Sequence, residues 1–166
     1  REFYGLKRKK DFRQLYTDGN YTAYMDIPNF VKIDRLPDKH FYLGPVIWSP
    51  EIKHFNKGLP KTNNAYISMG STGENSLIPK IIHGVLNNGL NVILSGVNNS
   101  EKTKLLKQIP NLENRSLIEP LIPAEEILPF SNLTICHGGS GTVYQSIYHG
   151  VPVVCFPKNP DQGLVS

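Results

Sequence analysis

From residue 65 onward, short apolar runs alternate with stretches that have helical periodicity. The apolar runs predict five strands, at residues 65–69, 91–94, 116–118, 133–136 and 151–156. The stretches between them predict helices at residues 75–86, 100–108, 123–128 and 142–148. Strands that are apolar throughout and joined through helices are typical of a parallel sheet covered on both faces. We therefore predict an α/β, Rossmann-like fold for residues 65–166.

Single residues mark where the predicted helices begin and end. Ser100 is expected to cap the second helix, because a serine side chain can accept from a free N–H of the first turn. Pro123 is expected to occupy the first position of the third helix, where its missing N–H costs little. Gly150 is expected to end the fourth helix.

The first 64 residues have no sustained period. Prolines recur there, so we expect mostly extended and looping chain, with a short helix at residues 7–16 and an apolar strand at residues 41–48. Residues 49–64 are polar and contain glycine and proline, which is typical of a linker. The predicted organisation is a domain tail at 1–48, a linker at 49–64 and the Rossmann-like domain at 65–166.

The formal charge of +4 is concentrated at the front of the chain. Residues 1–64 hold 12 Lys and Arg against 7 Asp and Glu, and the run at residues 7–10 is wholly basic. Such a run could contact anionic lipid, but it is more often a solvated end, and we expect no nucleic-acid partner. No apolar run approaches the ~20 residues of a membrane span. The chain starts at Arg1 without a signal-peptide pattern, so we expect a fragment of a cytoplasmic protein.

The two cysteines, Cys136 and Cys155, each fall in a predicted strand. Neither has a metal-ligand partner at usable spacing, so we expect buried free thiols. Glycosylation patterns begin at four asparagines, which without a secretory signal we interpret as chance matches in an asparagine-rich chain. They are Asn20, Asn98, Asn114 and Asn132.

The most informative stretch follows the fourth predicted strand. The apolar run ends at His137, passes into Gly138 and Gly139, and becomes helical soon after Gly141. This is a strand, a tight turn and a helix N-terminus, where free N–H groups and the helix dipole favour an anion. A plain alternative is a tight turn in which Thr142 caps the helix.

Two familiar motifs are close to this stretch but fit poorly. A dinucleotide-binding fingerprint would use Gly139, Gly141 and the later Asp161, but Tyr144 stands at the third glycine position. A serine-hydrolase elbow would use Ser140, but it needs an acid and then a histidine downstream, and no histidine follows Asp161. Both motifs are disfavoured.

A third interpretation rests on several segments in order. The run His137–Thr142, then Gly150–Val154, Pro157 and Asp161–Gln162, resembles the C-terminal donor-binding signature of GT-B glycosyltransferases. The resemblance is greatest to bacterial and plant enzymes that glycosylate lipophilic small molecules. It runs from about Phe41 to the end of the chain, and its further segments are Leu43–Pro45, Ser68–Ser71 and Ile122–Pro123.

The resemblance implies a set of donor-binding residues. The implied diphosphate contacts come from His137, from helix N–H groups and from an opposing loop, and glycines let the backbone approach the ligand. The set is Gly70, Ser71, Ile122, His137, Gly138, Gly139, Ser140, Gly141, Thr142, Gln145, Asp161 and Gln162.

Other members of this set would bind the base, the ribose and the sugar. Ile122 would offer backbone groups to the base, and Leu121 stands where plant members have a stacking tryptophan, so uracil and thymine both stay open. Gln145 stands where the family usually has a ribose-binding glutamate. Asp161 and Gln162 would bind sugar hydroxyls.

The implied function is donor binding in a hexosyltransferase-type enzyme. A UDP- or dTDP-sugar would be the co-substrate for inverting transfer to a small-molecule or lipid acceptor hydroxyl, with no metal and no further cofactor. The catalytic base would belong to an N-terminal acceptor domain of which residues 1–48 are the tail, so the fragment alone would be inactive. The alternatives are a lipid-linked sugar transferase, a nucleotide-sugar epimerase, or a non-catalytic donor-binding subunit of a split transferase.

Overall fold

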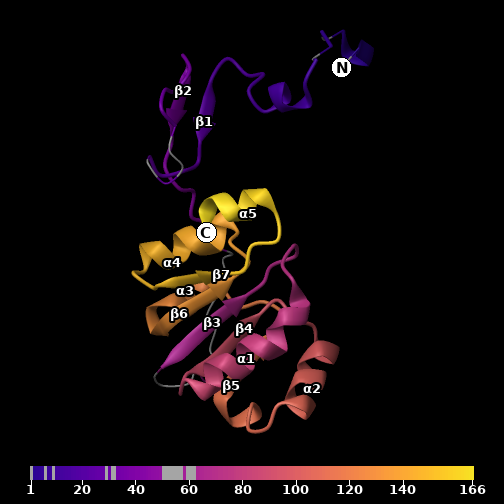
Figure 1. Cartoon of the computed structure of the whole chain (residues 1–166), viewed down its shortest axis with the longest axis vertical. Coiled ribbons are helices and arrows are strands. Elements are labelled where there is room, and N and C mark those ends of the chain that lie inside the picture. Colours follow the sequence, from indigo (N-terminus) through magenta and orange to yellow (C-terminus); the bar gives the residue numbers. More distant parts are fainter. Residues whose placement is uncertain are drawn as a thin grey trace. The chain divides into compact units, whose positions relative to one another are not determined.

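The computed structural model describes residues 2–5, 7–8, 10–28, 30, 33–49, 58 and 63–166. The chain divides into two compact units, residues 1–46 and residues 47–166 (Figure 1). Most of the predicted linker falls on residues 50–57 and 59–62, which lie outside the described residues. The predicted division into three parts therefore stays a prediction.

The first unit contains two short parallel strands and two 3-10 turns. The strands are β1 (Thr22–Tyr24) and β2 (His40–Tyr42), and the turns are η1 (Glu2–Tyr4) and η2 (Phe12–Leu15). The helix predicted at residues 7–16 is thus wrong, because the described part of that range has only the η2 turn. The strand predicted at residues 41–48 is also too long. It ends before Gly44, which has a φ of +90°, and Pro45, which has no N–H to donate.

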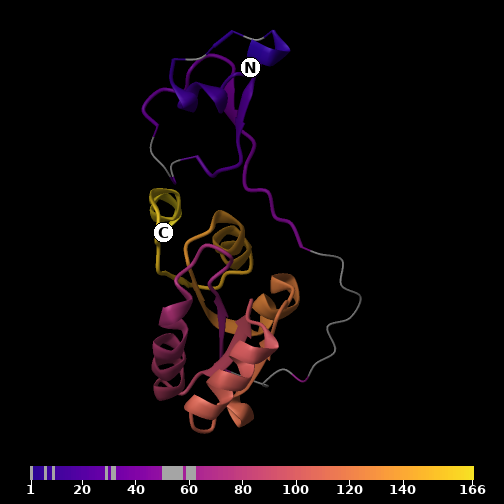
Figure 2. The ribbon, with the colours of Figure 1, turned by 90° about the vertical axis from the view of Figure 1, so that its right-hand side faces the viewer.

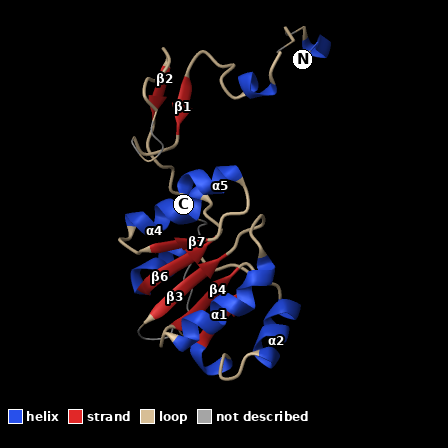
Figure 3. Cartoon of the chain, viewed as in Figure 1, coloured by secondary structure: helices blue, strands red, loops and turns tan. Residues whose placement is uncertain are grey.

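The second unit is built on a five-stranded, all-parallel sheet with the strand order β5-β4-β3-β6-β7 (Figure 3). The strands are β3 (Asn64–Ser68), β4 (Asn91–Ser95), β5 (Ser116–Glu119), β6 (Ser131–Cys136) and β7 (Val153–Cys155). All five correspond to the apolar runs of the sequence, so the predicted Rossmann-like sheet is confirmed.

Helices follow the strands and lie on both faces of the sheet, as the views in Figures 1 and 2 show. They are α1 (Ile78–Asn87), α2 (Asn99–Gln108), α3 (Ala124–Ile127), α4 (Ser140–Tyr148) and α5 (Pro160–Val165). Three 3-10 turns, η3 (Asn75–Leu77), η4 (Glu113–Arg115) and η5 (Leu128–Phe130), complete the unit.

Side chains alternate between two cores along each strand. Ala65 and Ile67 of β3 pack with α1 and α2 in one core, whereas Tyr66 packs with α3 in the other. A strand sends successive side chains to opposite faces, so an apolar strand with both faces buried needs helices on both sides. The helices cover the two faces of the sheet, so the loops at the carboxyl ends of the strands are the places where a ligand could bind.

Two predicted helix boundaries are wrong. Asn98, not Ser100, caps α2: its Oδ1 accepts from the N–H of Glu101 at 2.9 Å, while Oε2 of Glu101 accepts from the N–H of Asn98 at 2.9 Å. This reciprocal pair satisfies two free donors at once, which a cap at Ser100 could not do. Pro123 is the N-cap residue of α3 rather than its first helical residue. Gly150 follows the α4 C-cap residue His149 with a φ of +69°.

Among the described residues, the structure contains no helix with the length and hydrophobicity that crossing a membrane requires.

Candidate functional site

Three adjacent strands, β3, β6 and β7, end at the same edge of the sheet. The loops that follow them are the β3 loop (residues 69–74), the His137 loop (residues 137–139) and the β7 loop (residues 156–159). In parallel sheets, ligands bind outside the carboxyl ends of the strands. Most of the predicted site residues lie in these three loops or in the first turns of the helices that follow.

The imidazole ring of His137 lies between two glycines. A Cβ atom on Gly70 would be 2.6 Å from ring atom Cε1, and one on Gly139 would be 2.5 Å from Nε2. Both distances are far below contact, so neither position could hold a side chain with the ring in place. Among the described residues, Nδ1 of His137 has no hydrogen-bond partner although it is buried. Buried polar atoms are nearly always paired, so this nitrogen is an exception that marks the ring as unusual.

Gly138 lets α5 approach the His137 loop. Its φ is +84°, and a Cβ there would lie 2.9 Å from the carbonyl oxygen of Gln162. The N–H of Gly138 donates to Sγ of Cys136 at 3.4 Å. A larger residue at 138 would be strained and would also push α5 away, so Gly138 has a packing role.

The N-terminus of α4 has no side-chain cap. Its N-cap residue is Gly139, and the N–H of Val143 makes the first intrahelical bond, to the Gly139 carbonyl at 3.1 Å. The N–H groups of Ser140, Gly141 and Thr142 precede that bond and have no helical acceptor. Together with the dipole of a nine-residue helix, they favour a negatively charged group beside His137.

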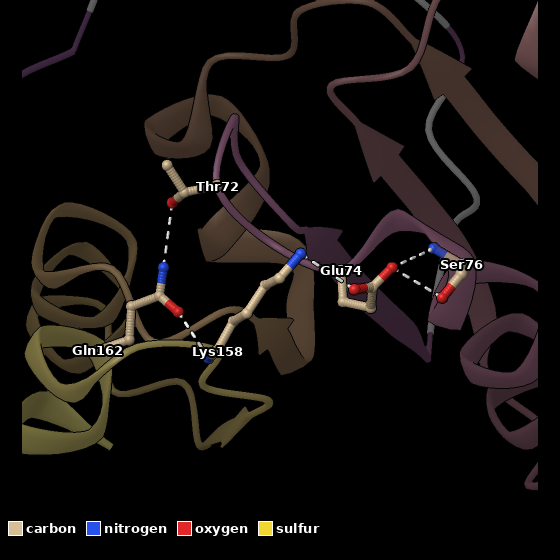
Figure 4. A network of polar contacts seen from close by, with 5 residues as sticks. All are labelled: Thr72, Glu74, Ser76, Lys158 and Gln162. Atoms are coloured by element: carbon tan, nitrogen blue, oxygen red, sulfur yellow. Dashed lines mark hydrogen bonds and ion pairs between the residues drawn. The ribbon is translucent and has the colours of Figure 1, made fainter.

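Polar side chains link the β3 loop to the β7 loop (Figure 4). Nε2 of Gln162 donates to Oγ1 of Thr72 at 3.0 Å, and Oε1 of Gln162 accepts from the backbone N–H of Lys158 at 2.7 Å. Nζ of Lys158 lies 3.0 Å from Oε2 of Glu74. Oε1 of Glu74 accepts from the Ser76 hydroxyl at 2.8 Å. Hydrogen bonds from Ser76, and then Lys158, hold the pKa of the Glu74 carboxyl below its usual value.

Two predicted sugar- or ribose-binding side chains are engaged within the protein. Gln162 is 3% exposed, and both ends of its amide are occupied as described above. Nε2 of Gln145 donates to the backbone oxygen of Trp48 at 2.8 Å. Asp161, in the first turn of α5, and Ser71, in the β3 loop, are exposed.

Ile122, the predicted base-binding residue, is buried at the edge of a core. Ile122 is 2% exposed and packs in the α3-side core with Tyr66 and Ile93. Its N–H donates to Oγ of Ser95 at 3.0 Å, so one of the two backbone groups expected to meet the base already has a partner in the protein. Leu121 beside it is exposed.

The two cysteines face each other across β6 and β7. Their Sγ atoms are 3.9 Å apart, and both thiols are free. Burial raises the pKa of the Cys136 thiol to about 12. Cys155 is only half-buried, so the prediction of buried thiols holds for Cys136 alone. In the described part of the chain, no three His, Cys, Asp or Glu side chains gather in a way that could hold a metal ion.

With this geometry in place, the relationship to known proteins is clear. Residues 57–164 match the family model described as UDP-glucoronosyl and UDP-glucosyl transferase. The chain belongs to this transferase family. A PGL/p-HBAD biosynthesis glycosyltransferase of Mycobacterium tuberculosis is 33% identical over 157 residues, which cover 93% of this chain and 35% of the relative. A PGL/p-HBAD biosynthesis rhamnosyltransferase of Mycobacterium bovis is 31% identical over 154 residues, covering 91% of this chain and 33% of the relative.

Solved structures support the same fold. The glycotransferase of kitacinnamycin superposes with a TM-score of 0.67 at 18% sequence identity, over 87% of this chain and 38% of that chain. The resemblance to GT-B glycosyltransferases is thereby confirmed for the fold. This transferase-family chain spans about a third of the length of the curated relatives it matches.

A groove with a volume of about 580 Å³ runs between α1 and the sheet of this family member. Leu133, Ile135 and Val154 line it on the sheet side, together with Phe156 at the start of the β7 loop. Thr134, between the first two, faces the opposite side and accepts from Ser146 of α4 at 2.9 Å. The groove is therefore on the sheet face that α4 does not cover, and its apolar walls offer little to a diphosphate.

Four polar residues in or near the three loops were not predicted from the sequence: Thr72, Glu74, Ser95 and Lys158. Ser95 had a recognisable signal, because it is a hydroxyl at the end of an apolar strand and directly before Gly96. The other three had no such signal, because the partners that they meet across the site are more than 80 positions away in the sequence.

Proposed function

We propose that this chain is the donor-binding part of a glycosyltransferase that takes a UDP- or dTDP-sugar. The observation that supports this most directly is the His137 imidazole, held between Gly70 and Gly139 with an unpaired Nδ1, beside the uncapped N-terminus of α4. A diphosphate fits this arrangement, because it supplies acceptors for the helix N–H groups and for His137.

The chemistry follows from the charge on the leaving group. When the bond from the sugar to the diphosphate breaks, negative charge grows on the diphosphate oxygens. Donors and a helix dipole that are fixed in advance stabilise that charge without reorganising. No metal or cofactor enters this proposal, because His137 and the helix N-terminus would neutralise the charge.

The description of the matching family names UDP-sugars, and one relative is named as a rhamnosyltransferase, so both uracil and thymine stay open for the base. A hexose is the proposed sugar, and a small-molecule or lipid hydroxyl the proposed acceptor. The acceptor would bind to a separate N-terminal domain, and that domain would also supply the base that deprotonates the acceptor hydroxyl. Transfer would be inverting. Peripheral membrane contact and a cytoplasmic location, both expected from the sequence, stay predictions.

Calorimetry with UDP, dTDP and inorganic diphosphate tests the proposal. The chain should bind at least one of the two nucleotides, and His137→Ala should weaken that binding about tenfold or more, as expected when a hydrogen bond to a charged group is lost. His149→Ala is the matched control, since His149 stands at the other end of α4 and also has a buried, unpaired ring nitrogen. The proposal is wrong if neither nucleotide binds at millimolar concentration, or if both variants bind like the parent chain.

A further inference from the structure

The two cysteines stand at the last positions of neighbouring parallel strands. Cys136 ends β6, Cys155 ends β7, and the register of the two strands pairs them directly. Their Sγ atoms are 3.9 Å apart, and both thiols are free. We call Cys136 and Cys155 the thiol pair. It lies where the His137 loop and the β7 loop begin.

The thiol pair is on the side of the sheet that α4 covers. Side chains two positions apart on a strand share a face, so Cys136 is on the same face as Thr134. Thr134 accepts from Ser146 of α4 at 2.9 Å. Cys155 faces the same way, because its sulfur is beside that of Cys136.

The spacing of the two strands suits a disulfide bond. Neighbouring strands are about 4.8 Å apart, and the Cα atoms of a disulfide are usually roughly 4.4–6.8 Å apart. The N–H of Phe156 donates to the Cys136 carbonyl at 2.8 Å, so the two strands are hydrogen-bonded at this point. An S–S bond of about 2.0 Å can therefore form by rotation of the two side chains, with the strands in place.

The two thiols differ in access to solvent. Cys136 is 0% exposed, whereas Cys155 is only half-buried. A reagent in solution therefore meets Cys155 first, and Cys136 is the second thiol that can displace what Cys155 has bound. An accessible thiol beside a second, resolving thiol is an arrangement found at cysteines that are oxidised reversibly.

The thiol pair is coupled to the His137 loop through one sulfur atom. Sγ of Cys136 accepts from the N–H of Gly138 at 3.4 Å. If this sulfur turns toward Cys155, the N–H loses its acceptor and the loop must adjust. The imidazole of His137 has little room for that, since a Cβ added to Gly139 would be 2.5 Å from Nε2.

We propose that Cys136 and Cys155 are an oxidation site, at which a low-molecular-weight disulfide converts the two thiols into one reversible disulfide bond and so alters the His137 loop. The oxidation itself is independent of the proposed function. Its expected effect on nucleotide binding rests on the proposed donor-binding role of His137.

Two exchange steps balance the reaction with glutathione disulfide. The Cys155 thiolate attacks one sulfur of the reagent, the reagent's S–S bond breaks, and one glutathione leaves and takes up a proton. Sγ of Cys136 then loses its proton and attacks Sγ of Cys155, which releases the second glutathione. The two thiols are oxidised to one disulfide, and one glutathione disulfide is reduced to two glutathione molecules. Burial raises the pKa of the Cys136 thiol, so the second step should be the slower one and should become faster with rising pH.

The first test treats the folded 166-residue chain with glutathione disulfide at pH 8. Intact-mass spectrometry should show the loss of two hydrogen atoms, and a peptide map should show Cys136 joined to Cys155. Dithiothreitol should restore the original mass, because a disulfide that solvent reaches is readily reduced.

The two serine variants separate the two steps. Cys136→Ser should keep one glutathione on Cys155, because no second thiol displaces it. Cys155→Ser should not react while folded, because Cys136 is buried. Melting temperatures close to that of the parent chain would show that both variants are folded, and the peptide map of the parent chain needs neither of them.

The second test follows the His137 loop. The amide signal of Gly138 in nitrogen-resolved NMR should shift on oxidation and return on reduction, while that of Gly84, in the middle of α1, should stay in place. Calorimetry should show UDP or dTDP bound at least about threefold more weakly by the oxidised chain, the loss expected for about one hydrogen bond. Treatment of Cys155→Ser with glutathione disulfide should not change its affinity.

Three results would count against the proposal or its premise. If the treated parent chain holds only glutathione adducts or links between two chains, the thiol pair is not an oxidation site. If the Cys136–Cys155 bond forms but the Gly138 amide does not shift, the bond does not alter the His137 loop. If neither form binds UDP or dTDP, the proposed function is wrong, and the peptide map and the Gly138 amide still decide the oxidation site.

Discussion

The side-chain amide of Gln145, in α4, donates a hydrogen bond to the backbone oxygen of Trp48 over 2.8 Å, across 97 positions of the sequence. Gln145 is 9% exposed. A glutamine can make this bond and an ionised glutamate cannot, because the Trp48 oxygen is an acceptor and a carboxylate has no proton to donate. The contact gives a reason for glutamine at a position where the resembling enzymes usually have glutamate.

Replacing Gln145 by glutamate should therefore destabilise the second unit. Near neutral pH the carboxylate would face the Trp48 carbonyl with no proton between them, and the free energy of unfolding should fall by about 1–3 kcal/mol. Gln145→Leu removes the donor without adding charge and should cost less. Urea unfolding at several pH values checks this.

The free energies of unfolding of Gln145→Glu and Gln145→Leu should approach each other as the pH falls, because a protonated carboxyl can donate to the Trp48 oxygen. Equal stability of Gln145→Glu and the parent chain at neutral pH would show that the Trp48 contact contributes nothing.

The strands and helices of the second unit could be predicted because their cause is local. An apolar run such as 91–94 is stable only when it is buried, as it is in β4. Residues 75–86 have the apolar spacing of a helix, and they form one after a first turn that is a 3-10 turn. The His137 motif was also visible, because three glycines around a histidine after a strand form a local pattern. The order and type of the elements therefore followed from the sequence.

The contacts of the site residues were not predictable in the same way. Gln162 meets Thr72 across 90 positions, and Gln145 meets Trp48 across 97, so no local period contains either pairing. The sequence shows which side chains are polar, but it does not show which of them form hydrogen bonds within the protein. The N-cap of α2 also depends on a pairing that was not predicted. Asn98 caps the helix instead of Ser100, because Glu101 stands three residues after Asn98 and its side chain accepts from the Asn98 N–H.

The close approach of Gly139 to His137 predicts a pair of substitutions that compensate each other. Gly139→Ala would place its Cβ 2.5 Å from Nε2 of the ring, and overpacking of this kind should lower stability by about 1–3 kcal/mol. In the background of His137→Ala the ring is absent, and most of that cost should disappear. A double-mutant cycle in thermal or urea unfolding measures the coupling.

Gly141→Ala is the control for this cycle, because a Cβ at Gly141 meets nothing within 4 Å. It should be neutral or slightly stabilising within α4. If Gly139→Ala and Gly141→Ala have the same effect, or if removal of the ring does not rescue Gly139→Ala, the packing of His137 against Gly139 is not as described.

The lowered pKa of Glu74 predicts how the β3 loop responds to acid. The causes are hydrogen bonds from Ser76 first and then from Lys158. A carboxyl whose pKa is lowered in the folded state adds stability above its unfolded pKa, and this contribution is lost as the pH falls through the folded pKa. The contacts of Glu74 should therefore weaken on the acid side and not on the alkaline side.

Carbon NMR of the Glu74 carboxyl can follow this titration. Ser76→Ala and Lys158→Met should each move the pKa upward, because each removes a group that lowers it, and added salt should matter only while Lys158 is present. Ser100→Ala, in exposed α2, should leave the titration unchanged. An unchanged pKa in Ser76→Ala would contradict the Ser76 hydroxyl as the main cause.

The two facing cysteines should differ sharply in reactivity. A thiolate is the reactive form, and burial raises the pKa of the Cys136 thiol to about 12, so this thiol is almost entirely protonated at pH 8. Cys155 is half-buried at the edge strand β7 and can meet the reagent. Iodoacetamide at pH 8 should therefore give one adduct on the folded chain, on Cys155, and two adducts in denaturant, as intact-mass spectrometry would show. Cys155→Ser should give none while folded; an adduct on Cys136 in the folded chain would mean that β6 opens to solvent beneath the His137 loop.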